Sequence, residues 1–210
     1  MSPATDLPRR VRMKIPVRPD PRTAPLSFFQ RQMWVIDQLA PGSPAYNLLR
    51  GLRLRGRLDI GILESAFNAV IRRHEVLRTT FTAEDGEPVQ CVQPELTIRI
   101  GVTSLERFPA EERETKAQSL ATAESLRPFD LSQLPLLRAA VFTLTAAEHI
   151  LIVNVHHIVA DGLSIDLLLN EVAAACRALA TGVEPAFPKM PLQYGDFAEW
   201  QRASWADGAA

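Results

Sequence analysis

The sequence predicts an α/β fold, arranged as an α+β layered sandwich in which helices pack on a mixed sheet. Stretches with apolar residues three and four positions apart, which are typical of helices, alternate with short stretches rich in Val, Ile and Leu, which are typical of strands. The 210 residues, of which 47% are hydrophobic and 22% charged, have an ordinary composition for one folded domain. The connections between the strands include hairpins, so the sheet is expected to be mixed rather than purely parallel.

Proline density sets the expected limits of the folded part. Residues 1–22 are predicted to form a Pro-rich N-terminal linker, because proline removes amide donors and favours extended chain. Residues 23–203 are predicted to form the folded region, and residues 204–210 a C-terminal tail.

The first elements follow from capping and periodicity. Ser27 and Gln30 have the spacing of a capping box, which predicts a helix that starts there and ends before Pro41. The partly alternating residues 47–58 predict a strand with one wet face. Asp59 is the expected cap of a second helix. The apolar side of that helix consists of Ile60, Leu63, Phe67, Val70 and Ile71.

Three short strands are predicted next, over residues 77–82, 88–92 and 97–102. Asp85 and Gly86 form a dipeptide that is typical of a tight turn, so the first two of these strands should form a hairpin.

The second half begins with a charged helix from Pro109 to about Leu126. Residues 136–144 and 149–156 are strong strand candidates, and the connection between them is short enough for a hairpin. A helix is expected after Gly162. Its apolar stripe consists of Ile165, Leu168, Leu169, Val172, Cys176 and Leu179.

Charge and cysteine content exclude several functions. The net charge of −1 and the isoelectric point near 6.4 offer no basic surface for nucleic acid or for an anionic membrane. Cys91 and Cys176 are far apart and form no zinc-binding pattern, which favours a reduced, cytoplasmic setting. The start of the chain lacks the apolar stretch of a signal peptide, and no apolar run is long enough to span a bilayer. We therefore expect neither a nucleic-acid partner nor a membrane.

The segment from His156 to Gly162, HHIVADG, is the main candidate for chemistry. Because side chains alternate along a strand, His156 and His157 should face opposite sides of the sheet. One imidazole would be held in structural hydrogen bonds, and the other would point into a cavity and serve as a base. Asp161 is expected to pair with an arginine, and Gly162 to permit a tight turn. Spacing alone leaves a purely structural role open, and no metal site is expected because the histidines diverge.

Three ordered motifs resemble the core motifs of condensation domains from nonribosomal peptide synthetases. They are Ser27–Trp34 (SFFQRQMW), Arg73–Phe81 (RHEVLRTTF) and His156–Gly162 (HHIVADG). The stretches Arg127–Leu131, Pro135–Arg138 and Gln193–Gln201 also resemble sequences common in this family. The resemblance covers residues 23–203, and the agreement in order makes it more specific than any single motif.

The resemblance implies the N-terminal lobe of a chloramphenicol-acetyltransferase-like fold. It implies that an acceptor aminoacyl amine attacks a donor acyl thioester, with both substrates carried on the 4'-phosphopantetheine arms of carrier proteins. His157 would position or deprotonate the amine, while His156, Asp161 and Gly162 would form the rest of the motif. Arg78 is the expected partner of Asp161, with Arg73 as the alternative. No cofactor is expected to be bound by this lobe.

The residues His156–Ser164 (HHIVADGLS) resemble domains that join an L-configured donor to an L-configured acceptor. Heterocyclisation domains differ because they have Asp in place of the first histidine. Epimerisation domains differ because their second motif usually lacks the Leu-Arg-Thr that stands here at residues 77–79.

By the same resemblance, a complete condensation domain has two similar lobes and about twice this length. The expected partners are therefore the missing C-terminal lobe, donor and acceptor carrier proteins and an adjacent adenylation domain. Since the second lobe supplies the far wall of the substrate tunnel, the isolated lobe is expected to lose much of the activity. The alternative function is a non-catalytic truncated lobe that docks a carrier protein or a neighbouring domain.

Overall fold

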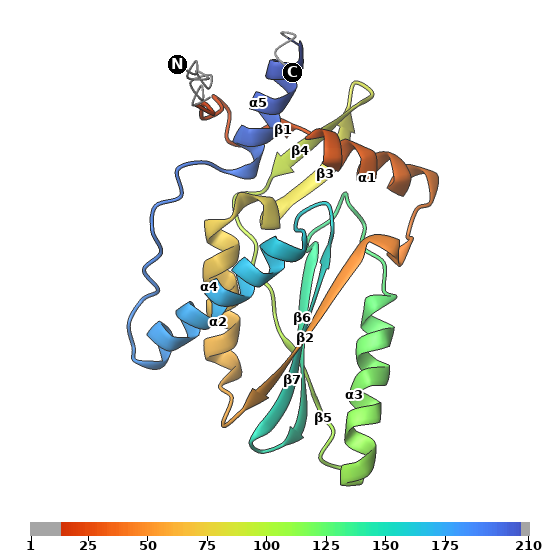
Figure 1. Ribbon diagram of the computed structural model, residues 1–210, viewed down its shortest axis with the longest axis vertical. Helices are drawn as coiled ribbons and strands as arrows, with labels where there is room; N and C mark the ends of the chain where they lie inside the picture. Colours follow the sequence, from red (N-terminus) through yellow and green to blue (C-terminus); the bar gives the residue numbers. More distant parts are fainter. Residues whose placement is uncertain (1–13, 207–210) are drawn as a thin grey trace, which may run out of the picture.

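The structure, a computed structural model, describes residues 14–206, which form two sheets flanked by helices (Figure 1). The larger sheet contains, in spatial order, β2 (Asn47–Arg55), β7 (Glu148–His156), β6 (Leu137–Thr145) and β5 (Gly101–Ser104). The smaller sheet contains, in spatial order, β1 (Thr23–Pro25), β4 (Glu87–Val92) and β3 (Thr79–Glu84). The predicted α/β fold class is confirmed. The larger sheet is mixed, because β5 pairs parallel to β6 while its other pairs are antiparallel.

Helices cover both faces of the larger sheet (Figure 1). On one face lie α2 (Ile60–Arg73) and α4 (Gly162–Ala180), and on the other lies α3 (Ala110–Ser125). Near the smaller sheet lie α1 (Phe28–Leu39) and α5 (Tyr194–Ala206). Two single-turn helices, η1 (Pro44–Tyr46) and η2 (Glu75–Arg78), precede β2 and β3. The large sheet is therefore the middle layer of a three-layer arrangement.

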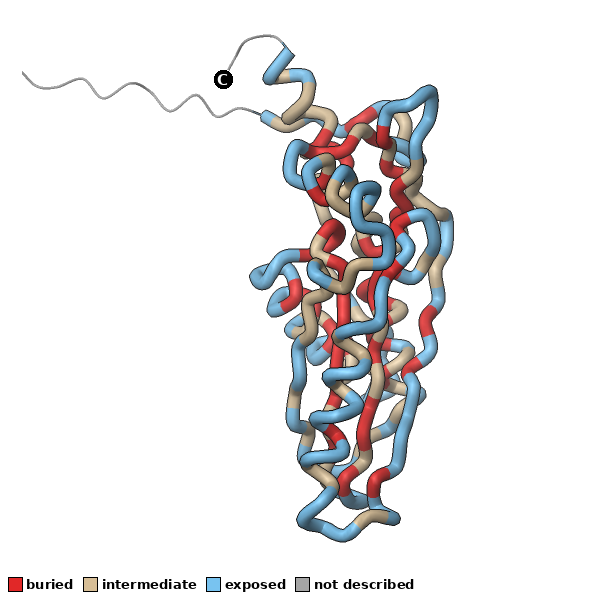
Figure 2. The backbone as a smooth tube through the Cα atoms, turned by 90° about the vertical axis from the view of Figure 1, so that its right-hand side faces the viewer, coloured by how far each residue is buried: buried red, intermediate tan, exposed pale blue. Residues whose placement is uncertain are grey.

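The strand β7 separates two apolar clusters. Leu151, Val153 and Val155 belong to the larger cluster, which includes α2 and α4. Ile152 belongs to the smaller cluster with Ala117 of α3. Figure 2 shows this buried backbone running along the molecule between exposed outer segments. Successive residues of β7 thus point to opposite faces, as the sequence predicts.

The predicted caps and the first hairpin are confirmed. The Ser27 hydroxyl accepts a hydrogen bond from the Gln30 amide at 3.2 Å, and the Gln30 side chain accepts one from the Ser27 amide at 3.0 Å. The Asp59 side chain accepts from the Ile62 amide at 3.0 Å. Asp85 and Gly86 both have positive φ, at 50° and 84°, and connect β3 to β4. Glycine is suited to that conformation because it has no Cβ.

The strand predicted over residues 97–102 is shorter than expected, because only Gly101–Ser104 form β5. Ile98 and Ile100 are buried, but their amides donate to the side chains of Asn68 at 2.9 Å and Glu64 at 2.9 Å. Side chains of α2 thus take the place of a neighbouring strand in satisfying this backbone.

Both ends of the described chain pack more closely than the sequence suggests. Arg18, inside the predicted linker 1–22, is only 6% exposed. The helix α5 continues through Ala206, past the predicted boundary at residue 203. Residues 1–13 of the predicted linker and 207–210 of the predicted tail lie outside the described residues. Within residues 14–206, no helix is both long and apolar enough to cross a membrane.

Candidate active site

The histidine motif lies where the central strand β7 ends and α4 begins. The His156 amide donates to the Leu136 carbonyl at 3.0 Å, and the His157 amide donates to the Tyr46 carbonyl at 2.9 Å. The backbone is therefore held from both sides of β7, which fixes the two imidazoles on opposite faces of the sheet.

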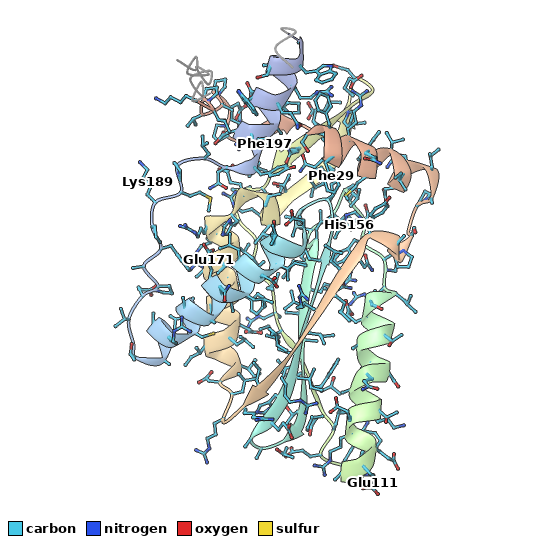
Figure 3. The ribbon with its side chains drawn as sticks, in the orientation of Figure 1. Phe29, Glu111, His156, Glu171, Lys189 and Phe197 are labelled. Atoms are coloured by element: carbon cyan, nitrogen blue, oxygen red, sulfur yellow. The ribbon has the colours of Figure 1, made fainter. Side chains whose placement is uncertain are left out.

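His156 is buried between aromatic rings. It is 3% exposed, and the rings of Tyr46 and Phe129 lie 6.2 and 6.1 Å from its own. Figure 3 shows it near the end of the large sheet that faces α1. Its Nδ1 accepts a hydrogen bond from the Ile158 amide at 3.1 Å. Burial, with a smaller effect from His157, lowers the pKa of His156 from 6.5 to about 4, so its ring is neutral at pH 7.

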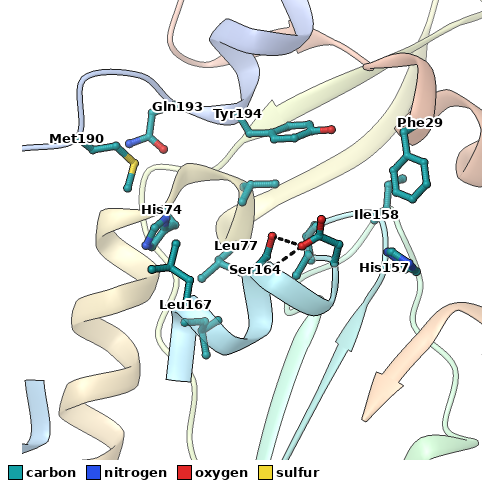
Figure 4. A pocket seen from close by; sticks show the side chains of 15 residues that line it. Phe29, His74, Leu77, His157, Ile158, Ser164, Leu167, Met190, Gln193 and Tyr194 are labelled. Carbon is teal, nitrogen blue, oxygen red and sulfur yellow. Dashed lines mark hydrogen bonds between the residues drawn. The ribbon is translucent and has the colours of Figure 1, made fainter. Parts of the chain in front are cut away.

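His157 lines a cavity of about 230 Å³, which we call the His157 pocket. Its ring meets that of Phe29 edge to face, with centroids 5.3 Å apart. Its Nδ1 is buried and has no hydrogen-bond partner among residues 14–206. Figure 4 shows His157 and Phe29 at one end of the pocket and His74 and Met190 at the other. The predicted division between a structural and a cavity-lining histidine therefore agrees with the geometry.

Asp161 caps α4, and within residues 14–206 it pairs with no arginine. Its Oδ1 accepts from the Ser164 amide at 2.7 Å and from the Ser164 hydroxyl at 2.6 Å (Figure 4). These hydrogen bonds lower the pKa of Asp161, and they give the carboxylate partners while it stays exposed. Arg78 instead donates to the Gln93 carbonyl and lies 4.0 Å from the Glu75 carboxylate. The predicted Asp161–Arg78 pair is wrong for this structure.

Arg73, the alternative partner for Asp161, is bound elsewhere as well. Its Nε lies 3.1 Å from Oε1 of Glu171, and its Nη1 donates to the Pro188 carbonyl at 2.5 Å. Nε2 of His74 lies 2.6 Å from Oε2 of the same Glu171, which projects from α4 towards α2 (Figure 3). Arg73 and His74 thus join α2 to α4 at one wall of the pocket.

Gly162 is the first residue of α4, and its φ does not lie in the left-handed region. A Cβ added at this position would have no atom within 4 Å. Gly162 was expected to permit a tight turn, and its backbone adopts no left-handed conformation that would require glycine. Its lack of a side chain leaves open space at the start of α4 instead.

Most of the pocket wall is apolar and comes from segments that the histidine motif does not reveal. Besides Phe29, His74 and His157, the lining residues are Val76, Leu77, Ile158, Val159, Ala160, Asp161, Ser164, Leu167, Leu168, Met190, Gln193 and Tyr194. Met190, Gln193 and Tyr194 follow α4 in the chain and were not predicted as site residues. No apolar periodicity marks that segment, although Gln193 and Tyr194 lie inside the family-like stretch Gln193–Gln201. Val76 and Leu77 lie inside the second motif, Arg73–Phe81, so the sequence contained a signal that could have identified them as pocket residues.

The pocket contains the imidazoles of His74 and His157. Among residues 14–206, no three His, Cys, Asp or Glu side chains are grouped so that they could hold a metal ion. A largely apolar cavity lined by the His157 imidazole is suited to proton transfer to or from a bound substrate.

The model of the family described as "Condensation domain" matches residues 21–207. Among curated proteins, a linear gramicidin synthase of Brevibacillus parabrevis is 42% identical over 194 residues, covering 91% of this chain. Phosphinothricin tripeptide synthetase PhsC of Streptomyces viridochromogenes is 42% identical over 189 residues, covering 90% of this chain. The alignments span only 2% and 17% of these two much longer proteins.

Solved structures give the same result for the fold. The starter condensation domain of rhizomide synthetase RzmA superimposes with a TM-score of 0.79 at 26% identity, over 87% of this chain and 44% of that one. A variant of that domain in complex with C8-CoA has a TM-score of 0.80 at 26% identity, over 88% and 42% of the two chains. The X-domain from teicoplanin biosynthesis, solved in complex with OxyB, has a TM-score of 0.77 at 30% identity, over 94% and 42%.

Proposed function

Since the chain belongs to the condensation domains of nonribosomal peptide synthetases, of which it spans about the N-terminal half, we propose that it supplies the histidine-bearing wall of an amide-forming site. The substrates are a donor acyl or peptidyl thioester and an acceptor aminoacyl thioester. Each is carried on the 4'-phosphopantetheine arm of a carrier protein. The relative that binds C8-CoA supports this choice, because coenzyme A contains the same pantetheine arm.

The observation that carries the proposal is the difference between the two adjacent histidines. His156 is buried, neutral and hydrogen-bonded to the turn, whereas His157 lines the pocket and packs edge to face on Phe29. Two imidazoles line this pocket, and His74 is bound to Glu171 at 2.6 Å. His157 is therefore the group in the pocket best suited to accept a proton from an amine.

In the proposed reaction the acceptor amine attacks the carbonyl carbon of the donor thioester. The C–N bond forms, the C–S bond breaks, and the donor's pantetheine leaves as a thiolate. His157 orients the amine and takes its proton, and the proton then passes to the thiolate to give the free thiol. His156 fixes the turn through the Ile158 amide, and Asp161 fixes the start of α4 through Ser164. Arg73 supports the pocket through Glu171, and Arg78 supports its own loop through Gln93.

The test joins the chain to the second lobe of a parent condensation domain, mixes it with an acyl-loaded donor carrier and an aminoacyl-loaded acceptor carrier, and follows carrier-bound amide by intact-protein mass spectrometry. We expect amide formation that His157→Ala reduces by about 100-fold or more, the usual range for losing a general base. His149→Gln is the matched control, because His149 lies on the same strand with its Nδ1 on Thr143 and outside the pocket. Equal rates for the wild type and His157→Ala would refute the role of His157.

The finer part of the proposal is that the donor and the acceptor are both L-configured. It rests on the resemblance of His156–Ser164 to domains of that subtype. The same assay with a donor thioester of D configuration at the reacting residue tests it. We expect slower amide formation with the D donor, and equal or faster formation would contradict the subtype.

A second candidate is a non-catalytic lobe that docks a carrier protein or a neighbouring domain. It is favoured by the likeness to the teicoplanin X-domain, which was solved bound to another protein, OxyB. This candidate predicts that carrier binding persists, without amide formation, in both the wild type and His157→Ala. A two-lobe parent domain that is active in the same assay is the reference. A carrier-binding measurement beside the mass spectrometry therefore separates the two functions.

A further inference from the structure

Arg18 is a buried, paired charged residue that the proposed reaction does not use. Its side chain is 2% exposed, and charged side chains are almost never buried to this degree unless they are paired. Its Nη1 lies 2.9 Å from Oδ1 of Asp196, and its Nη2 lies 2.5 Å from Oε2 of Glu75. Its Nε and Nη2 also donate to the carbonyls of Asp20 at 3.1 Å and Pro21 at 2.7 Å. Together these contacts hold the planar guanidinium in one position.

The two acidic partners of Arg18 also hold a residue of the pocket wall. Oδ2 of Asp196 accepts from the Gln193 amide at 2.8 Å, and the Glu75 amide donates to Oε1 of Gln193 at 3.1 Å. The Gln193 side chain also donates to the Arg73 carbonyl at 3.0 Å. Gln193 lines the His157 pocket, on the far side from His157 in Figure 4. Arg18 therefore contacts the pocket wall indirectly, because Asp196 and Glu75 each bind both Arg18 and Gln193.

Gly195 adds independent evidence that the guanidinium position is fixed. A Cβ on Gly195 would lie 2.6 Å from Nη1 and 2.8 Å from Cζ of Arg18. The backbone at Gly195 thus approaches the guanidinium so closely that no larger residue fits without a shift. The stretch Gln193–Gln201 resembles sequences of the family, but the histidine motif does not explain why. The contact with Arg18 gives a reason for two of its residues, because Gly195 makes room for the guanidinium and Asp196 pairs with it.

From these contacts we propose that Arg18 is a positioning residue for the proposed amide-forming site. It binds the chain segment before β1 to Glu75 and Asp196, and through them it fixes Gln193 and the neighbouring Tyr194 in the pocket wall. Tyr194 is held from its other end by the Ser27 hydroxyl at 3.0 Å. The inference rests on the proposed function only for its effect on the reaction, because the contacts themselves do not depend on it.

The expected kinetic effect follows from which parts of the site Arg18 reaches. Through Asp196 and Glu75, Arg18 supports the part of the wall that contains Gln193. The position of His157 does not depend on Arg18, because the His157 amide donates to the Tyr46 carbonyl at the end of β7. Loss of Arg18 should therefore weaken binding of the carrier-bound substrates and leave proton transfer intact. We expect Arg18→Met to raise KM by about fivefold or more with kcat within about twofold of the wild type.

The test compares Arg18→Met with Arg22→Met in the full chain. Arg22 lies on the same segment, but its side chain is 82% exposed and pairs with Asp20 at 3.0 Å. Hydrogen exchange followed by mass spectrometry should show faster exchange over residues 190–197 in Arg18→Met and no change in Arg22→Met. Gly195→Ala is the second variant, because it displaces the guanidinium without removing a charge, and it should have the same local effect.

Three results would overturn the proposal. The first is unchanged exchange over residues 190–197 in Arg18→Met. The second is exchange that rises throughout the chain in both Arg18→Met and Gly195→Ala. The third is a fall in kcat at constant KM in Arg18→Met. If the wild type forms no amide even when the second lobe is present, the proposed function fails, and the exchange results alone then decide whether Arg18 holds the pocket wall.

Discussion

His156 is packed against two aromatic rings while His157 lines a cavity, although the two are adjacent in the chain. The difference arises from β7, because consecutive residues of a strand point to opposite faces. Burial then disfavours the charged form of His156 and lowers its pKa to about 4. One element thus gives the same side chain two different environments.

This pKa predicts how stability depends on pH. Between pH 6.5 and about 4 the unfolded chain binds a proton at His156 that the folded chain excludes, so the free energy of unfolding falls as the pH falls. The contribution is fully present above pH 6.5 and amounts to about 3 kcal/mol. We expect urea denaturation at pH 7, 6 and 5 to show a steeper loss for the wild type than for His156→Asn, whose side-chain oxygen can still accept from the Ile158 amide. Parallel curves for the two proteins would contradict the assigned pKa.

Sequence reasoning could predict the opposite orientation of the histidines because that depends only on strand alternation. It failed for Asp161, whose partner was expected to be a distant arginine. The carboxylate is satisfied three residues away by Ser164, at the spacing of a helix cap, and that spacing was visible in the sequence. The contact of Arg78 with the Gln93 carbonyl joins two loops, and no local pattern indicates such a pairing.

At the scale of elements, α3 depends on its C-terminal contacts. Ala117 is its one fully buried residue, so apolar packing holds it only weakly. The Asn154 side chain donates to the Glu124 carbonyl at 2.8 Å, and the Asn47 side chain donates to the Ser125 and Arg127 carbonyls, each at 2.8 Å. The last carbonyls of a helix have no partner within it, so these two asparagines tie α3 to the large sheet.

We therefore expect Asn154→Ala to loosen α3 more than the rest of the lobe. Loss of the buried hydrogen bond should cost about 1–2 kcal/mol and speed amide exchange over residues 110–125. Asn68→Ala is the matched control, because Asn68 bonds the backbone of Ile98, on the other side of the sheet, and should affect residues 96–100 instead. Equal exchange over residues 110–125 in the two variants would rule out the special role of Asn154.

Elements with strong periodicity and a cap were predictable to within a few residues, as α1 and α2 illustrate. The strand β1 was missed because it has three residues and ends in Pro25, and proline favours a linker interpretation. The helix α5 was missed because its buried residues are Gly195, Asp196 and Ala198, which give no apolar stripe. Its position depends instead on the buried ion pair with Arg18, a contact between residues 178 positions apart.

At the scale of the whole molecule, the chain spans 42–44% of the solved domains to which it is similar. Two leucines near the pocket are left uncovered by this lobe. Leu163 is 81% exposed and Leu167 is 54% exposed, and Leu167 also lines the pocket. Both lie in the first turns of α4, next to Asp161. An apolar surface beside a proposed active site is a place where another part of the protein commonly packs.

If the second lobe of the family covers this surface, the two lobes should associate through it when they are produced separately. We expect the double variant Leu163→Ser with Leu167→Ser to weaken their association by about tenfold or more. Burial of the two leucine side chains would favour association in the wild type, and serine provides much less apolar surface to bury. Isothermal titration calorimetry measures this affinity, and Leu39→Ser is the control because Leu39 is 80% exposed at the end of α1 and outside the pocket. Since all three side chains are largely exposed, none of the changes should alter the free energy of unfolding by more than about 0.5 kcal/mol. Unchanged affinity in the double variant would mean that the second lobe packs elsewhere, and that the first turns of α4 face the carrier-bound substrates or solvent instead.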